Sequence, residues 1–179
     1  MPRHKPQKQP SAEFIAELAK EVGRAIIAAS TIEHDIGIIM ARLLKLTKLQ
    51  HRAMLIPMSI SNKLTVLRQL SREFLPPNEH KAVKKLLDEI KTYAEKRNDL
   101  AHGFYGVKNG NFVLITFSGN ARFSGQPTSW TPKHIRMLVQ EMAISRSQLR
   151  SIEFLFPKPL KLPKIRPTIA AFQQASERE

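Results

Sequence analysis

The sequence predicts a mainly α-helical bundle of four to five helices, with a small β-hairpin inserted before the last long helix. Three observations predict this class. Apolar residues recur at intervals of three and four over four long stretches, as one face of a helix requires. The pair Asn109-Gly110 stands between β-favouring residues, which is a strong hairpin signal. The apolar content of 42% suffices for a packed core, and 179 residues fit one domain with tails.

The first helix is predicted to run from Ser11 to about Leu46. Ser11 suits the N-cap position, because its hydroxyl can accept a hydrogen bond from a free N–H of the first turn, and Glu13 follows near the positive end of the helix dipole. The inward stripe is long for a small domain, so we expect part of it to lie in a homodimer interface. Its members are Ile15, Leu18, Val22, Ala25, Ala29, Ile32, Ile36, Ile39 and Leu43.

Two further helices are predicted between residues 61 and 103. One follows Ser61 and Asn62 and stops at Pro76-Pro77, because proline cannot continue a helix. The next begins at the cap-like Asn78 and stops near Gly103, a favourable residue for a helix C-terminus. Their apolar stripes are Leu64, Leu67, Leu70 and Phe74 in the former, and Val83, Leu86, Leu87, Ile90, Tyr93 and Ala94 in the latter.

The remaining elements are a hairpin, a last helix and two tails. The residues around Asn109-Gly110 predict a hairpin at about 104–124. Thr131-Pro132 reads as an N-cap followed by proline at the first helical position. The chain then divides into a basic, flexible N-terminus at 1–10, a helical domain at 11–156 and a basic, proline-rich C-terminal tail at 157–179.

The charge indicates a polyanionic partner. Lys and Arg number 29 against 15 acidic residues, which gives a net charge of +14, and no acid occurs between Ile36 and Arg72. A one-signed surface field of this kind favours a phosphate polymer, a nucleic acid, as the partner. A basic protein that is merely soluble, or one that touches acidic membranes or an acidic protein, remains the alternative. The candidate RNA-binding residues are Arg42, Lys45, Lys48, Arg122, Lys158 and Lys161.

Several classes of function are excluded by what the sequence lacks. It has no cysteine, so it has no disulfide framework and no cysteine chemistry. No apolar run approaches the length of about 18 residues that a membrane span needs, and no apolar segment follows the basic N-terminus as in a secretory signal. We therefore expect a cytoplasmic protein without a membrane partner. The histidines lack metal-ligand spacing, so we expect no metal and no cofactor.

A cluster of polar residues stands where the third helix ends, in the stretch YAEKRNDLAHGFYG at 93–106. The inward stripe of that helix reaches Arg97, and burying an unpaired guanidinium costs several kcal/mol. Arg97 therefore needs an acid, a cleft or an interface, and Glu33 at the rim of the first stripe is the candidate acid. Asn98 and His102 are four residues apart and share a helix face. Alternatively, Arg97 bridges two helices, Asn98 caps the backbone and His102 complements the helix dipole.

The spacing Arg97-Asn98-x-x-x-His102 resembles the Arg-x(4–6)-His motif, with Asn directly after Arg, of the HEPN-domain family. Proteins of that family are small helical bundles that usually carry the motif at the end of a late helix, and many are RNA-cleaving toxins or defence effectors. The order of predicted helices resembles the family over roughly residues 11–155. The specific match in sequence is limited to the six-residue motif.

The resemblance implies a metal-independent endoribonuclease with a toxin–antitoxin or phage-defence role, acting as a homodimer whose two motifs share one cleft. It implies that His102 moves protons, Arg97 clamps the phosphate, Asn98 orients either group, and Glu33 faces the motif. An antitoxin or a defence protein would be a further partner. Two alternatives stay open. One is a non-catalytic RNA-binding or scaffolding bundle, and the other is an interaction module for an acidic protein.

Overall fold

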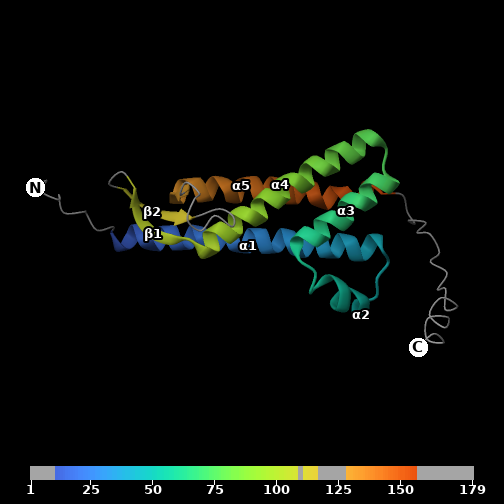
Figure 1. The fold of residues 1–179 in the computed structure, drawn as a ribbon, viewed down its shortest axis with the longest axis horizontal. Helices are drawn as coiled ribbons and strands as arrows, with labels where there is room; N and C mark the ends of the chain where they lie inside the picture. Colours follow the sequence, from blue (N-terminus) through green and yellow to red (C-terminus); the bar gives the residue numbers. More distant parts are fainter. Residues whose placement is uncertain (1–10, 109–110, 117–127, 157–179) are drawn as a thin grey trace, which may run out of the picture.

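The computed structural model describes residues 11–108, 111–116 and 128–156, and it confirms a mainly α-helical bundle with a small antiparallel sheet (Figure 1). In chain order the elements are α1 (Ala12–Leu43), α2 (Lys48–Gln50), the π-helix η1 (His51–Leu55), α3 (Ile60–Phe74), α4 (Pro77–His102), β1 (Phe104–Lys108), β2 (Asn111–Thr116), β3 (Thr128–Trp130), α5 (Pro132–Ile152) and the short 3₁₀ helix η2 (Glu153–Leu155).

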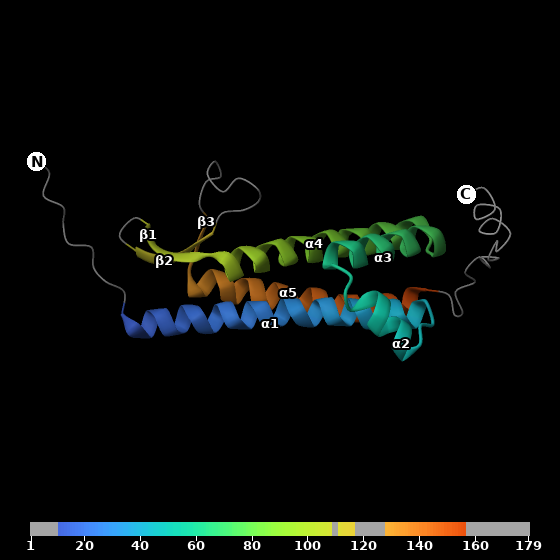
Figure 2. The same ribbon diagram turned by 60° about the horizontal axis from the view of Figure 1, so that its bottom comes forward.

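The helices form two layers. Helices α1 and α5 lie side by side along the long axis, and α3 and α4 cover them as a second layer (Figures 1 and 2). The core lies between the layers and contains apolar side chains from all four helices. Each large apolar side chain stabilises the fold by about 1.5–3 kcal/mol when it is buried. The fully buried members of the core include Leu18, Ile36, Leu67, Leu87 and Met142.

The helix ends follow local backbone chemistry. The hydroxyls of Ser11 and Thr131 accept hydrogen bonds from Phe14 N and His134 N, as the sequence predicts for both caps. Helix α3 begins earlier than predicted, because Ser59 caps it. The prediction that Asn78 caps α4 is wrong. Pro77 is the first helical residue there, a position that suits proline because its missing N–H would have no partner.

Helix α1 ends at Leu43, short of the predicted Leu46, in a Schellman motif. Leu46 N donates to Ala41 O at 2.9 Å, and Lys45 N donates to Arg42 O at 3.2 Å. Lys45 takes the left-handed conformation that this motif requires, with a φ of 52°. Glycine is the usual residue there, and its absence explains why the apolar stripe alone placed the helix end too late.

The sheet has three antiparallel strands in the order β1-β2-β3. Strand β1 pairs with β2 from Phe104 opposite Ile115 to Lys108 opposite Asn111, so the connection falls at the predicted Asn109-Gly110, which lies outside the described residues. Strand β3 pairs Trp130 with Leu114, and both side chains are buried against the bundle. The sequence did not predict this third strand. No helix in the described ranges is both long enough and apolar enough to cross a membrane.

Ion pairs connect the α1 and α5 pair along its outer side. Asp35 Oδ2 accepts hydrogen bonds from Arg146 Nε at 2.8 Å and Arg150 Nε at 3.0 Å. Burial raises the pKa of the Asp35 carboxyl, but the hydrogen bonds and charges of Arg146 and Arg150 outweigh this effect and hold the pKa below its ordinary value of 3.8. Glu33, two residues before Asp35, instead contacts Lys63 of α3 and Arg97 of α4 in the other layer.

Candidate functional site

The predicted motif lies along the last two turns of α4, just before the chain enters the sheet. Arg97 is on the side of α4 that faces α1 and α3, as its place in the apolar stripe predicts. It borders a small notch with a volume of about 10 Å³, too small for more than a single water. The other lining residues are Ala29, Ile32 and Glu33 of α1, Ile60 of α3, and Ile90, Tyr93 and Ala94 of α4.

Glu33 connects two cations at this notch. Its Oε2 lies 3.7 Å from Arg97 Nη2, so the predicted pair is present, and its Oε1 lies 3.0 Å from Lys63 Nζ. Lys63 is only 5% exposed, whereas the side chains of Glu33 and Arg97 are 28% and 29% exposed. The three groups sum to one positive charge. Because Lys63 holds the shorter contact, Arg97 is bound loosely and keeps part of its guanidinium toward solvent.

The strength of the two contacts differs for a geometric reason. Lys63 Nζ donates a hydrogen bond to Glu33, while the longer distance to Arg97 exceeds ordinary hydrogen-bond length. Arg97 Nε is buried and has no hydrogen-bond partner among the described residues. Arg97 is therefore partly exposed, and Glu33 does not satisfy all of its hydrogen-bond donors.

Asn98 and His102 are exposed on the outer side of α4. His102 is the last helical residue, and Gly103 continues in extended conformation with a φ of −70°. Within the described part of the chain, neither side chain has a hydrogen bond or ion pair, and neither contacts Arg97. One protomer thus presents an imidazole and an amide to solvent on the outer side of α4, while Arg97 lies on the side that faces α1 and α3. It does not assemble the three into one hydrogen-bonded group.

The remaining predicted RNA-binding residues fall into two groups. Lys45 and Lys48 are exposed, and Arg42 donates to Glu153 at 2.9 Å while its side chain stays 63% exposed. Arg122, Lys158 and Lys161 lie outside the described residues. The structure therefore keeps Arg42, Lys45 and Lys48 exposed at and just beyond the C-terminal end of α1, and Arg42 lies about 14 Å along the helix from Glu33.

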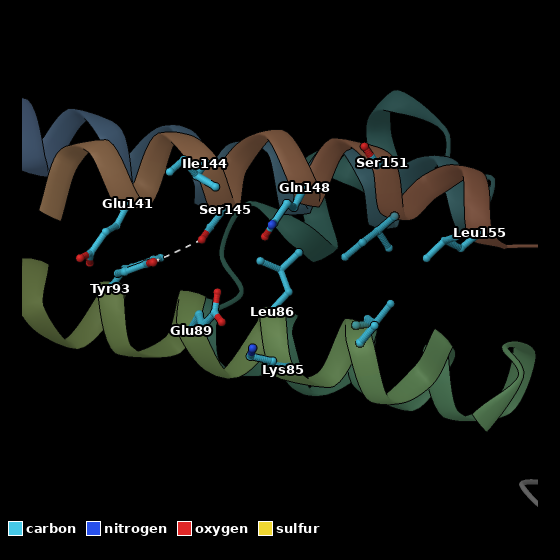
Figure 3. Close-up of a pocket in the computed structure, with 13 residues that line it drawn as sticks. Lys85, Leu86, Glu89, Tyr93, Glu141, Ile144, Ser145, Gln148, Ser151 and Leu155 are labelled. Atoms are coloured by element: carbon cyan, nitrogen blue, oxygen red, sulfur yellow. Dashed lines mark hydrogen bonds between the residues drawn. The ribbon is translucent and has the colours of Figure 1, made fainter. Parts of the chain in front are cut away.

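Sequence reasoning missed two features near the motif. One is Lys63, a cation of the acid-free stretch between Ile36 and Arg72, which falls on the buried stripe of α3 one residue before Leu64. The other is a largely apolar groove between α4 and α5 with a volume of about 460 Å³ (Figure 3). In the groove Tyr93 Oη and Ser145 Oγ lie 3.3 Å apart, in hydrogen-bond contact. Tyr93 also lines the notch beside Arg97, so one ring separates the two spaces.

No group of three or more His, Asp or Glu side chains that could hold a metal ion occurs among residues 11–108, 111–116 and 128–156. Comparison of the chain with protein-family models, with curated proteins and with solved structures gave no match. The arrangement at the end of α4 is therefore interpreted from its own chemistry and from the resemblance of its motif.

Proposed function

We propose that this chain is an RNA-binding protein of the HEPN type that cleaves RNA without a metal ion, as a homodimer, in a toxin–antitoxin or phage-defence role. The observation that carries the proposal is the state of Arg97. It lies at the end of α4 with its acid at 3.7 Å, while Lys63 neutralises that acid from 3.0 Å. An arginine held in this way keeps net positive charge for a phosphate, and an exposed imidazole follows five residues later.

The chemistry that suits these groups is transesterification within RNA. The ribose 2′-hydroxyl attacks the adjacent phosphorus, one histidine accepts the hydroxyl proton, and a second acid protonates the departing 5′-oxygen. The products are a 2′,3′-cyclic phosphate and a 5′-hydroxyl end. A dimer supplies His102 twice, once as base and once as acid. Arg97 stabilises the charge that builds on the phosphate oxygens, and Asn98 orients the phosphate or the imidazole.

The net charge of +14 supports a nucleic-acid substrate. Binding that depends on phosphate contacts weakens linearly with the logarithm of salt concentration, so RNA affinity is expected to fall steeply between about 50 and 200 mM salt. The requirement for a 2′-hydroxyl nucleophile predicts that DNA of the same sequence binds and is not cleaved.

The test incubates the purified full chain with end-labelled RNA in EDTA. His102→Ala and Arg97→Ala are each expected to reduce the cleavage rate about 10²–10⁴-fold while the fold is kept. His34→Ala is the matched control, because His34 is also an exposed helical histidine but lies on α1. Cleavage that persists in His102→Ala, or that falls equally in His34→Ala, contradicts the assigned roles.

A second candidate function is RNA binding without cleavage. It is favoured by the lack of any hydrogen bond joining Arg97, Asn98 and His102 within the described part of one protomer. The same experiment separates the two functions. Wild-type protein that binds RNA at low salt and leaves it intact supports the binding function. Light scattering that shows only monomer at the assay concentration also favours it, since the proposed chemistry uses two histidines.

A further inference from the structure

The segment between α1 and α3, residues 45–58, stands out from the two-layer body beside the C-terminal part of α1 (Figures 1 and 2). Its conformation is specified locally. Lys45 turns the chain out of α1, and Thr47 forms a capping box in which Gln50 N donates to Thr47 Oγ1 and Thr47 N donates to Gln50 Oε1. The two turns that follow are α2 and η1, and together with Ile56 they are called the α2–η1 segment, residues 48–56.

One face of the α2–η1 segment is anchored to the body. Leu55 is 2% exposed and belongs to the core, and His51, four residues earlier, approaches Gly37 of α1, where a Cβ would lie 3.5 Å from His51 Nε2. Residues four apart share a helix face, so His51 and Leu55 define the inward side. The segment is therefore held in place rather than free to bury its other side chains.

The opposite face is apolar and points away from the protein. Leu49 of α2, Ala53 of η1 and Ile56 directly after η1 are all exposed, whereas Leu55 is buried and His51 approaches α1. Leu49 is 76% exposed and Ile56 is 62% exposed, and Met54 on the flank is 53% exposed. An amphipathic helix ordinarily buries its apolar stripe, and here the outer stripe is turned to solvent.

The same segment carries positive charge without acids. Lys45, Lys48 and Arg52 are exposed, and among the described residues none of them forms an ion pair. No Asp or Glu occurs from Ile36 to Arg72 in the sequence. The outward face thus combines protruding aliphatic side chains with unpaired cations, and its partner must offer both apolar volume and negative charge.

We propose that the α2–η1 segment docks on an anionic lipid surface, with Leu49 and Ile56 entering the acyl boundary and Lys48 and Arg52 at the headgroup level. A projecting apolar surface enters a bilayer directly, whereas a folded protein partner would need a groove that matches it. RNA does not account for the aliphatic residues, since they cannot stack on bases as aromatic rings do. Docking on a surface requires no membrane span, and contact with acidic membranes is one of the alternatives that the charge of the chain leaves open. The inference does not depend on catalysis by Arg97 and His102, and it assigns Lys48, a candidate RNA-binding residue, to the lipid surface.

The first experiment measures sedimentation of the full chain with vesicles of phosphatidylcholine containing about 30% phosphatidylserine, and with pure phosphatidylcholine vesicles. The wild type is expected to bind the anionic vesicles at least about tenfold more strongly than the neutral ones. Leu49→Ser combined with Ile56→Ser is expected to weaken binding about tenfold or more. The matched control is Ile144→Ser, which removes an isoleucine of the same 62% exposure from α5 and is expected to change binding less than about twofold.

The second experiment locates the contact. Because the chain has no cysteine, Leu49→Cys and Ile144→Cys each give one attachment site for a polarity-sensitive fluorophore. Anionic vesicles are expected to shift the emission of the label at residue 49 to the blue and to leave the label at residue 144 unchanged.

Three outcomes overturn the lipid proposal. The first is no vesicle binding by the wild type, and the second is equal shifts at residues 49 and 144. The third is loss of RNA affinity in Lys48→Gln with Arg52→Gln while binding to the anionic vesicles stays at the wild-type level, which would assign these cations to RNA. Circular dichroism of each variant checks that the fold is retained.

Discussion

Replacing Lys63 by methionine tests whether the Glu33 network is held by its buried cation. Methionine keeps the apolar stem and removes the ammonium group that lies 3.0 Å from Glu33. At an effective dielectric constant of about 20, this contact is an attraction of about 5–6 kcal/mol, and desolvation of the two ions offsets most of it. Glu33 is 28% exposed and retains Arg97 at 3.7 Å, so its carboxylate is only partly deprived of partners. We expect Lys63→Met to lower the free energy of unfolding by about 1–3 kcal/mol.

The assay is urea unfolding followed by circular dichroism, arranged as a double-mutant cycle with Glu33→Gln. The double variant is expected to be more stable than the sum of the single losses predicts, with a coupling energy of at least about 1 kcal/mol. Lys63→Arg is the conservative control and should retain most of the coupling. A coupling energy below about 0.3 kcal/mol would refute the reasoning, because the contact would then add nothing beyond the separate effects of its two side chains.

The same variant has a consequence for Arg97. Without Lys63, Glu33 has one remaining cation, and the contact of 3.7 Å is expected to shorten into a hydrogen-bonded pair. Arg97 then has less positive charge to offer a phosphate. We expect RNA affinity at low salt to fall about three- to tenfold in Lys63→Met, and to recover in the double variant with Glu33→Gln. Unchanged affinity would mean that Arg97 does not contact RNA.

Three further predictions concern other parts of the molecule. Asp35→Asn should lower the free energy of unfolding by about 1–2 kcal/mol at pH 7, measured by urea unfolding at a series of pH values. Because Arg146 and Arg150 depress the pKa of Asp35, the difference from wild type should persist above about pH 4. It should shrink at lower pH, as the carboxyl of the folded state is protonated. Lys45→Gly should raise Tm by about 2–4 °C, since glycine takes a φ of 52° without a Cβ penalty. Arg97→Lys should keep RNA affinity within about threefold and reduce cleavage at least about tenfold, in gel and rate assays, because an ammonium group lacks the forked donors of arginine.

The long helices were predictable because each carries a repeating apolar stripe, and α1 and α5 also begin at a side-chain cap. Ser11 and Thr131 cap their helices as predicted, and the Asn-Gly pair correctly located the hairpin. The α2–η1 segment was not predictable from periodicity, since its apolar residues face outward and only Leu55 reaches the core. Strand β3 has three residues, too few to show an alternating pattern against its surroundings.

The candidate site was predictable in part. A guanidinium on an apolar stripe requires compensation, and Glu33 at the rim of the first stripe was the candidate acid, which the contact of 3.7 Å with Arg97 confirms. This requirement did not identify Lys63, because lysine is ordinarily exposed and its stem fits an apolar stripe as well as a surface. The placement of Lys63 between Ile60 and Leu67 on α3 was the available signal. In the proposed homodimer, Arg97 of one protomer and His102 of the other act on one phosphate, and no pattern within one chain encodes how they meet.

The pairing of α1 with α5 has a consequence for synthesis of the chain. Asp35 and Arg146 are 111 residues apart, and the two helices form the most extensive helix contact of the fold. On the ribosome the apolar stripe of α1 emerges first and stays without this neighbour until most of the chain has been translated. The nascent chain is therefore expected to engage a chaperone during elongation, and slowing translation upstream of α5 should lengthen that interval rather than help folding.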